Sequence, residues 1–244
     1  MIPTMNALLQ VRVALGVLAL GFIPLLIAGC KAPPAKTTGF FGETDGLQAV
    51  PEIEAVHQMW AKPGVDWNKF KKIQIAPVNT KFLRERTVWQ KMSFAEFDEK
   101  GVQNMADFVR QTFVAAQRNN RGRYRLEVVN QPDRETVVLE MAITELVPTK
   151  NWLNLVTITA VMYSFDKGVI AIEGRLRDGP DGEIIGKFTD REAGKDNILN
   201  IKDFSLSAHA RAIIEEWAQQ SVKITNAEEG ETVRDSSAFE WKVW

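Results

Sequence analysis

Residues 169–190 read VIAIEGRLRDGPDGEIIGKFTD, and this stretch predicts the central element of the fold. Its two halves, 169–177 and 183–190, alternate apolar with polar residues, and DGPDG at 178–182 separates them. Glycine tolerates positive φ and proline fixes φ, so these five residues are typical of a turn. Two alternating runs around such a turn predict a β-hairpin in an antiparallel sheet. The side chains expected in its core are Ile170, Ile172 and Leu176, with Ile184 and Phe188 opposite.

Other stretches earlier in the chain extend the predicted sheet. Residues 137–146 show the most regular alternation of apolar and polar side chains. One face of this strand would carry Leu139, Met141 and Ile143. Residues 72–78 and 123–129 predict two shorter strands. Residues 151–163 are apolar and rich in β-branched side chains, so they form either a buried strand or a strand with a flap.

Apolar residues at helical spacing predict two main helices, at about 94–118 and about 203–222. Their buried stripes would be formed by Phe94, Phe97, Met105, Phe108, Val109, Phe113 and Ala116 in the first helix, and by Leu206, Ala210, Ile213 and Trp217 in the second. Gly101 leaves open whether the first is one helix or two, because glycine weakens a helix interior. The spacing of Ile53, Val56 and Trp60 predicts a short further helix at 51–60.

The order of these elements defines the expected fold class, which is α/β of the α+β kind. A strand, a helix, several strands and a final helix would build a two-layer sandwich, in which two main helices cover a mostly antiparallel mixed sheet. Residues 47–225 are expected to form this single domain. Residues 226–244 would form an acidic and aromatic C-terminal tail.

The stretch LLIAGC at 25–30 resembles the lipobox of bacterial lipoproteins, in which a small residue precedes a cysteine that becomes lipidated. Residues 13–29 are apolar and end on a small-residue pair, as a cleaved signal peptide does. A membrane-spanning helix needs roughly 20 apolar residues without breaks, whereas this run is shorter and contains Pro24. We therefore predict a lipoprotein signal peptide at 1–29 and lipidation of Cys30, the only cysteine of the chain.

Residues 30–46 are expected to form the lipidated cysteine and a flexible tether, because proline, threonine and glycine interrupt regular structure there. Phe40-Phe41 would either pack on the domain or dip into the membrane interface as an accessory anchor. Acyl chains on Cys30 would bind the lipid bilayer. Lys31 follows the cysteine, which resembles the pattern of lipoproteins sent to the outer membrane. The expected location is therefore the bacterial cell envelope, lipid-anchored at the outer membrane and facing the periplasm.

Composition excludes some classes of function. The chain has 30 Lys and Arg against 31 Asp and Glu, a formal net charge of −1. This near-neutral balance argues against nucleic acid as a partner. A single cysteine leaves no disulfide to form within the domain, so packing alone would hold it together.

The sequence carries no catalytic or ligand-binding signature. The two histidines, His57 and His209, lie far apart and outside any metal-ligand spacing. We therefore predict no catalytic residue, no metal and no cofactor. Asp178 and Asp181 are explained by the turn in which they lie. One basic cluster remains, formed by Arg118, Arg121, Arg123 and Arg125. It is either a solvated turn or a contact for anionic lipid headgroups, which attract basic residues near a charged surface.

Several of these segments, taken in their order, resemble one family of bacterial lipoproteins. They are the lipobox, Gly39-Phe40-Phe41-Gly42, Lys62-Pro63-Gly64-Val65-Asp66-Trp67, the strands at 72–78 and 139–146, Gly182-Glu183, Asp190-Arg191-Glu192-Ala193-Gly194 and the final helix with Trp217. The family is known only as a domain of unknown function (three-three-one-three). The resemblance implies the fold and the outer-membrane location, and it supplies no activity. Residues 83–100 and the tail after Asn226 are longer than the family pattern.

Three functions are compatible with these features. The first is a non-catalytic lipoprotein of the cell envelope that binds another component or accompanies an assembly, with an envelope protein as partner. The second is an envelope hydrolase with Asp190 and Glu192 in a cleft, which requires two carboxyl groups at a suitable separation. The third is a carrier of a lipid or small ligand, in which residues 151–163 serve as a lid.

Overall fold

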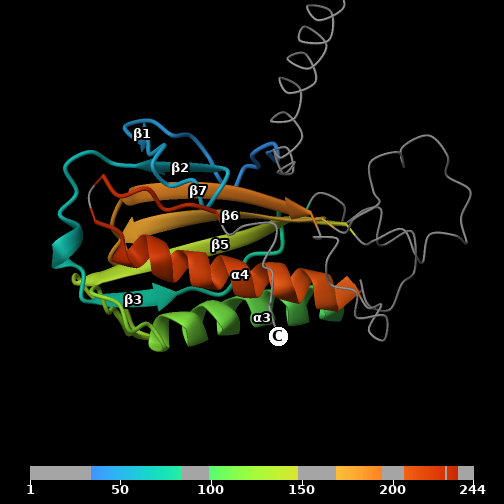
Figure 1. Ribbon diagram of the computed structural model, residues 1–244. Coiled ribbons are helices and arrows are strands. Elements are labelled where there is room, and N and C mark those ends of the chain that lie inside the picture. The colour runs from blue at the N-terminus through green and yellow to red at the C-terminus, as the bar shows by residue number, and fades with distance from the viewer. Residues whose placement is uncertain (1–33, 84–98, 148–168, 194–205, 229, 236–244) are drawn as a thin grey trace, which may run out of the picture. The chain divides into compact units, whose positions relative to one another are not determined.

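The computed structural model describes residues 34–83, 99–147, 169–193, 206–228 and 230–235. All of them belong to one compact unit that begins at Ala32. Its elements, labelled in Figure 1, are β1 (Gln48–Ala49), β2 (Gln58–Ala61), the 3-10 helix η2 (Trp67–Lys69), β3 (Lys72–Ile75), α3 (Glu99–Arg118), β4 (Glu127–Val128), β5 (Thr136–Val147), β6 (Val169–Asp178), β7 (Ile184–Ala193) and α4 (Leu206–Asn226). Expectations for Cys30, Phe94, Phe97, residues 151–163, the start of the second helix at about 203 and the last nine residues lie outside the described residues.

The seven strands of the described ranges form one mixed sheet in the order β1-β2-β7-β6-β5-β3-β4. The three long strands β5, β6 and β7 are antiparallel neighbours at its centre. β3 runs parallel to both β4 and β5, so the chain crosses over through α3 between β3 and these two strands. The expected fold class, an α+β sandwich of a mixed sheet and two helices, is confirmed.

Both helices cover the same face of the sheet (Figure 1). They run parallel, because Arg211 of α4 stacks 4.2 Å from the ring centre of Phe108 in α3, and Gln117 further along α3 reaches Ser221 and Thr225 further along α4. The core lies between this helical layer and the sheet. Its fully buried members include Val109 and Phe113 of α3, Ile214 of α4, and Met141, Ile143, Ile170 and Ile172 of the sheet.

The hairpin forms as expected, since β6 and β7 pair around the turn that follows Asp178. One side chain differs from the expectation. Ile185, not Ile184, belongs to the core. The register shifts between Leu176 and Arg177, and such an irregularity re-aims the side chains next to it.

The prediction of a short helix at 51–60 is wrong, because Gln58–Ala61 forms strand β2. Met59 pairs with Phe188 and Trp60 with Lys187 of β7. This backbone pairing outweighs the helical spacing of three apolar residues, since a helix of about ten residues is marginal on its own. Two smaller differences follow. Gly101 lies inside one continuous α3, and of the strand expected at 123–129 only Glu127–Val128 forms a strand.

Both faces of the central strands are buried. Leu139, Met141 and Ile143 face the helices, as expected, and Val138, Ala142 and Thr144 on the other face are also buried. Phe40 and Phe41 cover part of that second face, where they are 5% and 3% exposed. Of the two alternatives for this pair, packing on the domain is confirmed. In the described ranges, neither helix has the length and hydrophobicity that a membrane span requires.

Candidate functional site

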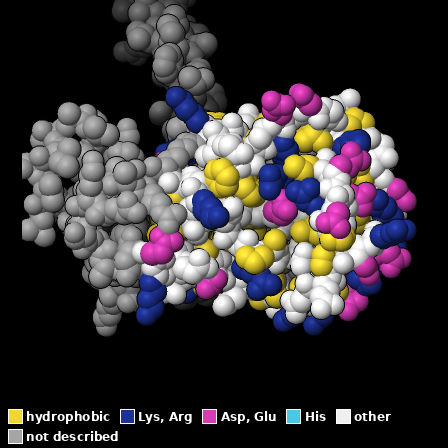
Figure 2. All heavy atoms as spheres, turned by 180° about the vertical axis from the view of Figure 1, so that it is seen from behind, with side chains coloured by type: hydrophobic (Ala, Val, Ile, Leu, Met, Phe, Trp, Pro, Cys, Tyr) yellow, Lys and Arg dark blue, Asp and Glu magenta, His cyan; other side chains and the backbone are white. Residues whose placement is uncertain are grey.

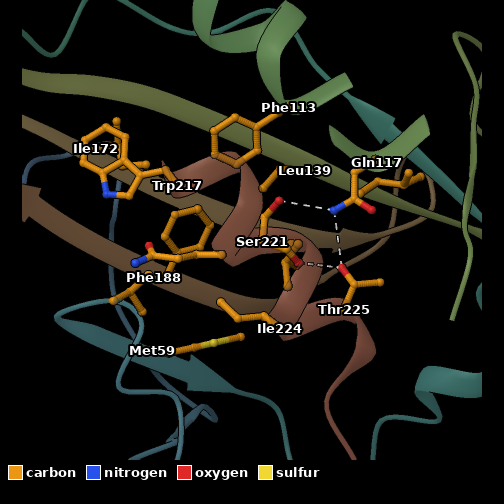
Figure 3. A pocket seen from close by; sticks show the side chains of 14 residues that line it. Met59, Phe113, Gln117, Leu139, Ile172, Phe188, Trp217, Ser221, Ile224 and Thr225 are labelled. Carbon is orange, nitrogen blue, oxygen red and sulfur yellow. Dashed lines mark hydrogen bonds between the residues drawn. The ribbon is translucent and has the colours of Figure 1, made fainter. Parts of the chain in front are cut away.

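A cavity of about 100 Å³ lies where the ends of α3 and α4 meet the sheet (Figure 3). Most of its lining is apolar. The residues around it are Val56, Met59, Ile73, Phe113, Gln117, Leu139, Ile172, Leu176, Phe188, Trp217, Gln220, Ser221, Ile224 and Thr225. The apolar stripes of α3 and α4 form the helical wall of the cavity, because residues spaced by three or four positions share one helix face. Small-molecule sites are concave, mostly apolar and equipped with a few polar groups, and this cavity has that composition.

Gln117 is the polar group that α3 contributes to the cavity. Its Nε2 lies 3.2 Å from Ser221 Oγ and 3.4 Å from Thr225 Oγ1. Figure 3 shows the amide nitrogen pointing toward these two hydroxyl groups. Both hydroxyls already donate to backbone oxygens of α4, at 2.7 and 2.8 Å, so toward Gln117 they act as acceptors. The side chain is 3% exposed, and its Oε1 has no hydrogen-bond partner among the described residues.

Gln220 is the matching polar group of α4. Its Nε2 donates to Asp235 Oδ1 at 2.7 Å, which fixes the amide because a carboxylate only accepts. The side chain is 2% exposed, and its Oε1 also lacks a partner among the described residues. The two glutamines therefore line one cavity, while their Oε1 atoms are themselves buried in the packing around it.

Asp190 fixes the wall of the cavity at Trp217. The indole Nε1–H of Trp217 donates to Asp190 Oδ2 at 2.6 Å. The other oxygen, Oδ1, accepts from the backbone N–H of His57 at 2.9 Å and lies 2.5 Å from His57 Nδ1. Asp190 is fully buried, so one carboxylate holds the segment before β2, strand β7 and helix α4 together.

The contacts of Asp190 argue against the envelope hydrolase that the sequence left open. Both oxygens of Asp190 are engaged with groups of the chain itself, and neither Asp190 nor Glu192 lines the cavity. Arg191, which lies between these two residues, binds Glu145 of β5 with two hydrogen bonds of 2.8 and 3.0 Å. In the described ranges no three His, Cys, Asp or Glu side chains gather in a way that could hold a metal ion.

The face of the sheet turned away from the helices has a different chemistry. Figure 2 shows this side of the molecule, where basic and acidic side chains alternate with hydrophobic ones. Arg175 illustrates the mixture, because its guanidinium binds Glu140 at 2.8 Å and stacks 4.2 Å from the ring centre of Phe40. Lys187 is buried beside Phe41, and burial together with the Arg175 charge lowers the pKa of its ammonium group.

Glu173 binds the N-terminal segment to this face. One carboxylate oxygen accepts from the backbone N–H of Thr38 at 2.6 Å. The other accepts from Thr38 Oγ1 at 2.6 Å and from the backbone N–H of Phe41 at 3.0 Å. Glu173 is 1% exposed, and hydrogen bonds to a charged acceptor are about twice as strong as neutral ones. The segment that leads away from Cys30 is therefore fixed to the sheet at Thr38.

The four arginines of the basic cluster lie at the end of α3 and in the turn that follows it, and all are exposed. Arg123 pairs with Glu228 and stacks on Tyr124, and Arg125 donates to the backbone oxygens of Gly122 and Arg121. In the described part of the chain, the guanidinium groups of Arg118 and Arg121 have no recorded hydrogen bond or ion pair. Contact with anionic lipid stays a prediction, as does lipidation of Cys30.

The family model described as "Protein of unknown function (DUF3313)" matches residues 36–221, most of the chain. The chain belongs to this family. The family expected from the residues is thus confirmed, and its lipoprotein character stays a prediction. No curated protein sequence matches the chain.

Among solved structures, this chain is similar to PelC dodecamers from Paraburkholderia phytofirmans. One, in space group P6, has 13% sequence identity and a TM-score of 0.37, and the match covers 70% of this chain and 96% of that chain. The other, a point variant in space group C2, has 15% identity and a TM-score of 0.34, with 66% and 89% covered. At these TM-scores the likeness carries no argument about function.

Sequence reasoning missed the two glutamines, the His57-Asp190-Trp217 contacts and Glu173. A local signal existed for the glutamines. Gln117 follows Phe113 by four positions and Gln220 follows Trp217 by three, so both fall on the apolar stripes where a polar residue is unusual. No comparable local signal pointed to the contacts of Asp190 or Glu173, because their partners lie far away in the chain.

Proposed function

We propose that this protein is a lipid-anchored lipoprotein of the bacterial cell envelope that binds another envelope component without catalysing a reaction. The observation that carries the proposal is the attachment of the N-terminal segment to Glu173. Thr38 lies eight positions after Cys30. At a full extension of about 3.5 Å per residue, eight residues span at most about 28 Å. A lipidated Cys30 would hold the domain within that distance of the bilayer.

Permanent attachment of the domain close to the bilayer favours a function that is carried out at the membrane surface. Two or more acyl chains give stable anchoring, whereas one chain binds only marginally. The described site supports binding better than acid–base chemistry, because the carboxylate of Asp190 is fully occupied by structural contacts. We therefore favour a binding module or an accessory subunit of an assembly over the hydrolase.

The anchor is tested first. The mass of the native protein should exceed the mass of residues 30–244 by that of the acyl chains, and Cys30→Ala should leave the protein unprocessed and without acyl chains. A native protein that retains residues 1–29, or that carries no acyl group, would refute the lipoprotein assignment.

The binding role is tested by the mass of the native particle after mild detergent extraction. A second polypeptide that remains bound through purification supports the accessory-subunit version and identifies the partner. A protein that migrates alone and captures nothing after crosslinking in intact cells would rule that version out. The Cys30→Ala variant serves as the control, because it should lose any partner that depends on membrane attachment.

A further inference from the structure

After α4 the chain returns to the edge of the cavity. Val233 is 6% exposed, and its backbone pairs with the segment that precedes β2. Two positions later, Asp235 accepts a hydrogen bond of 2.7 Å from Nε2 of Gln220, a residue that lines the cavity. The last part of the chain, residues 236–244, therefore continues from a point that is fixed beside the cavity.

The sequence of this last part has an apolar face. Residues 236–244 read SSAFEWKVW, in which three apolar side chains, at 239, 241 and 243, alternate with Glu240 and Lys242. Successive side chains of an extended chain point to opposite sides, so the apolar ones share one face and the charged ones share the other. This alternation is typical of a half-buried strand, which requires an apolar surface on one side.

The opening of the cavity offers such a surface (Figure 3). Met59 of β2, Ile224 of α4, and Leu176 and Phe188 of the central hairpin all line the cavity and are only half-buried. An apolar cavity of about 150 Å³ binds benzene. This cavity has about 100 Å³ and is open on one side, so it has room for one phenyl ring whose edge remains at the opening.

We propose that residues 236–244 dock on this surface in an extended conformation and place the ring of Phe239 in the cavity. Phe239 follows Asp235 by four positions, which span up to about 14 Å in an extended chain. The larger indole of Trp241 covers the opening against Met59 and Ile224, and the charged side chains face the solvent.

Docking within one chain has an advantage over binding a separate molecule. A short linker gives the attached segment an effective concentration of about millimolar, so a contact of modest affinity is formed most of the time. The apolar face of the segment and the half-buried side chains at the opening are then removed from water together. This inference does not involve the membrane anchor, so its failure and the failure of the proposed envelope role are separate results.

The position of the docked segment can be tested by disulfide formation in the full-length chain. Cys30→Ala removes the only native cysteine. On this background, Trp241→Cys is combined with Ile224→Cys, or with Lys223→Cys as the matched control. Lys223 is the exposed neighbour of Ile224. Docking predicts that the pair at 241 and 224 forms an intramolecular disulfide at least about tenfold faster than the pair at 241 and 223.

Phe239→Ser tests whether the ring in the cavity holds the segment. Added to both cysteine pairs, it should remove the difference in rate, whereas Ser237→Ala should preserve it. Oxidation of Met59 by hydrogen peroxide gives a second readout without new cysteines. It should be at least about fivefold faster in Phe239→Ser than in the wild type, while Met141, which is 1% exposed, keeps its rate.

Three results would overturn the proposal. The first is a disulfide to position 223 that forms as fast as the one to position 224, since a segment that moves freely reaches the exposed position more easily. The second is disulfide-linked dimers whose yield rises with protein concentration, which would assign the surface to the segment of a second copy. The third is a rate difference and a rate of Met59 oxidation that Phe239→Ser leaves unchanged.

Discussion

At the scale of single residues, the Asp190 carboxylate connects three segments that lie far apart in the chain. It is fully buried and accepts from the backbone of His57 and from the indole of Trp217, while His57 Nδ1 lies 2.5 Å from Oδ1. A buried charge is tolerated only when its hydrogen-bonding capacity is met. The stability of the region therefore depends on the donors that surround this carboxylate.

Trp217→Phe tests this dependence. The substitution removes the indole N–H, which leaves Asp190 Oδ2 buried without that donor, and it also enlarges the cavity that Trp217 lines. We expect the free energy of unfolding to fall by about 2–3 kcal/mol, measured by urea denaturation. Trp67→Phe is the control, because Trp67 is 43% exposed and should change stability by less than about 0.5 kcal/mol. Equal effects of the two substitutions would contradict this account of Asp190.

Asp133 supplies a pH-dependent contribution at the start of β5. The Lys72 ammonium at 2.5 Å and the Thr136 hydroxyl at 2.7 Å lower the pKa of Asp133 from 3.8 to about 2. A carboxyl whose pKa is lower in the folded state stabilises the fold above its unfolded pKa, and this contribution disappears as the pH falls through the folded pKa. Asp133→Asn should therefore lower the urea midpoint at about pH 6 and have a smaller effect at about pH 3. Asp181→Asn, at an exposed turn position, is the control. A difference between wild type and Asp133→Asn that grows toward low pH would refute the assignment.

At the scale of elements, the contact between β6 and β7 shapes the cavity. Gly174 pairs with Phe188 across the two strands, and Phe188 forms part of the cavity wall. The ring of Phe188 lies over Gly174, and a Cβ atom at this position would overlap Phe188 Cε1. The absence of a side chain at 174 therefore sets the position of the ring.

Gly174→Ala should move Phe188 away from β6 and destabilise the hairpin. Extra atoms in a packed interior cost about 1–3 kcal/mol, which urea denaturation measures. Gly39→Ala is the control, since its Cβ would meet its nearest neighbour, Phe82, at an ordinary 3.6 Å. If Gly174→Ala has the same free energy of unfolding as the wild type, the ring of Phe188 can shift without cost and Gly174 does not set its position.

The elements that sequence reasoning predicted are those with a local signal. The alternation in β5, β6 and β7 and the spacing in α3 and α4 arise from neighbours in the chain, so one sequence suffices to find them. β2 was missed because it forms by pairing with β7, more than a hundred residues later. The contact of Thr38 with Glu173 has the same origin. Apolar stripes predicted the helical wall of the cavity, and the two polar interruptions in them were the unused signal for Gln117 and Gln220.

At the scale of the whole domain, the sheet separates two chemistries. The helical side holds the core and the apolar cavity. The opposite side holds ion pairs such as Glu145–Arg191, together with the N-terminal segment that would connect the domain to the anchor (Figure 2). The cavity and the segment that leads toward the predicted anchor therefore lie on opposite faces of one sheet.

Glu173→Gln tests the attachment of the N-terminal segment. Glutamine keeps one acceptor oxygen but loses the charge, and hydrogen bonds to charged groups contribute about 1.5–3 kcal/mol. We expect local opening of residues 38–41 to become easier by about 2 kcal/mol, so that the Phe41 amide exchanges with deuterium roughly thirtyfold faster while amides in β5 keep their rates. Glu183→Gln is the control, because the ion pair of Glu183 with Lys62 is exposed and lies at the hairpin turn. If the Phe41 amide exchanges at the same rate in both variants, Glu173 does not fix the segment, and the short distance between domain and bilayer loses its basis.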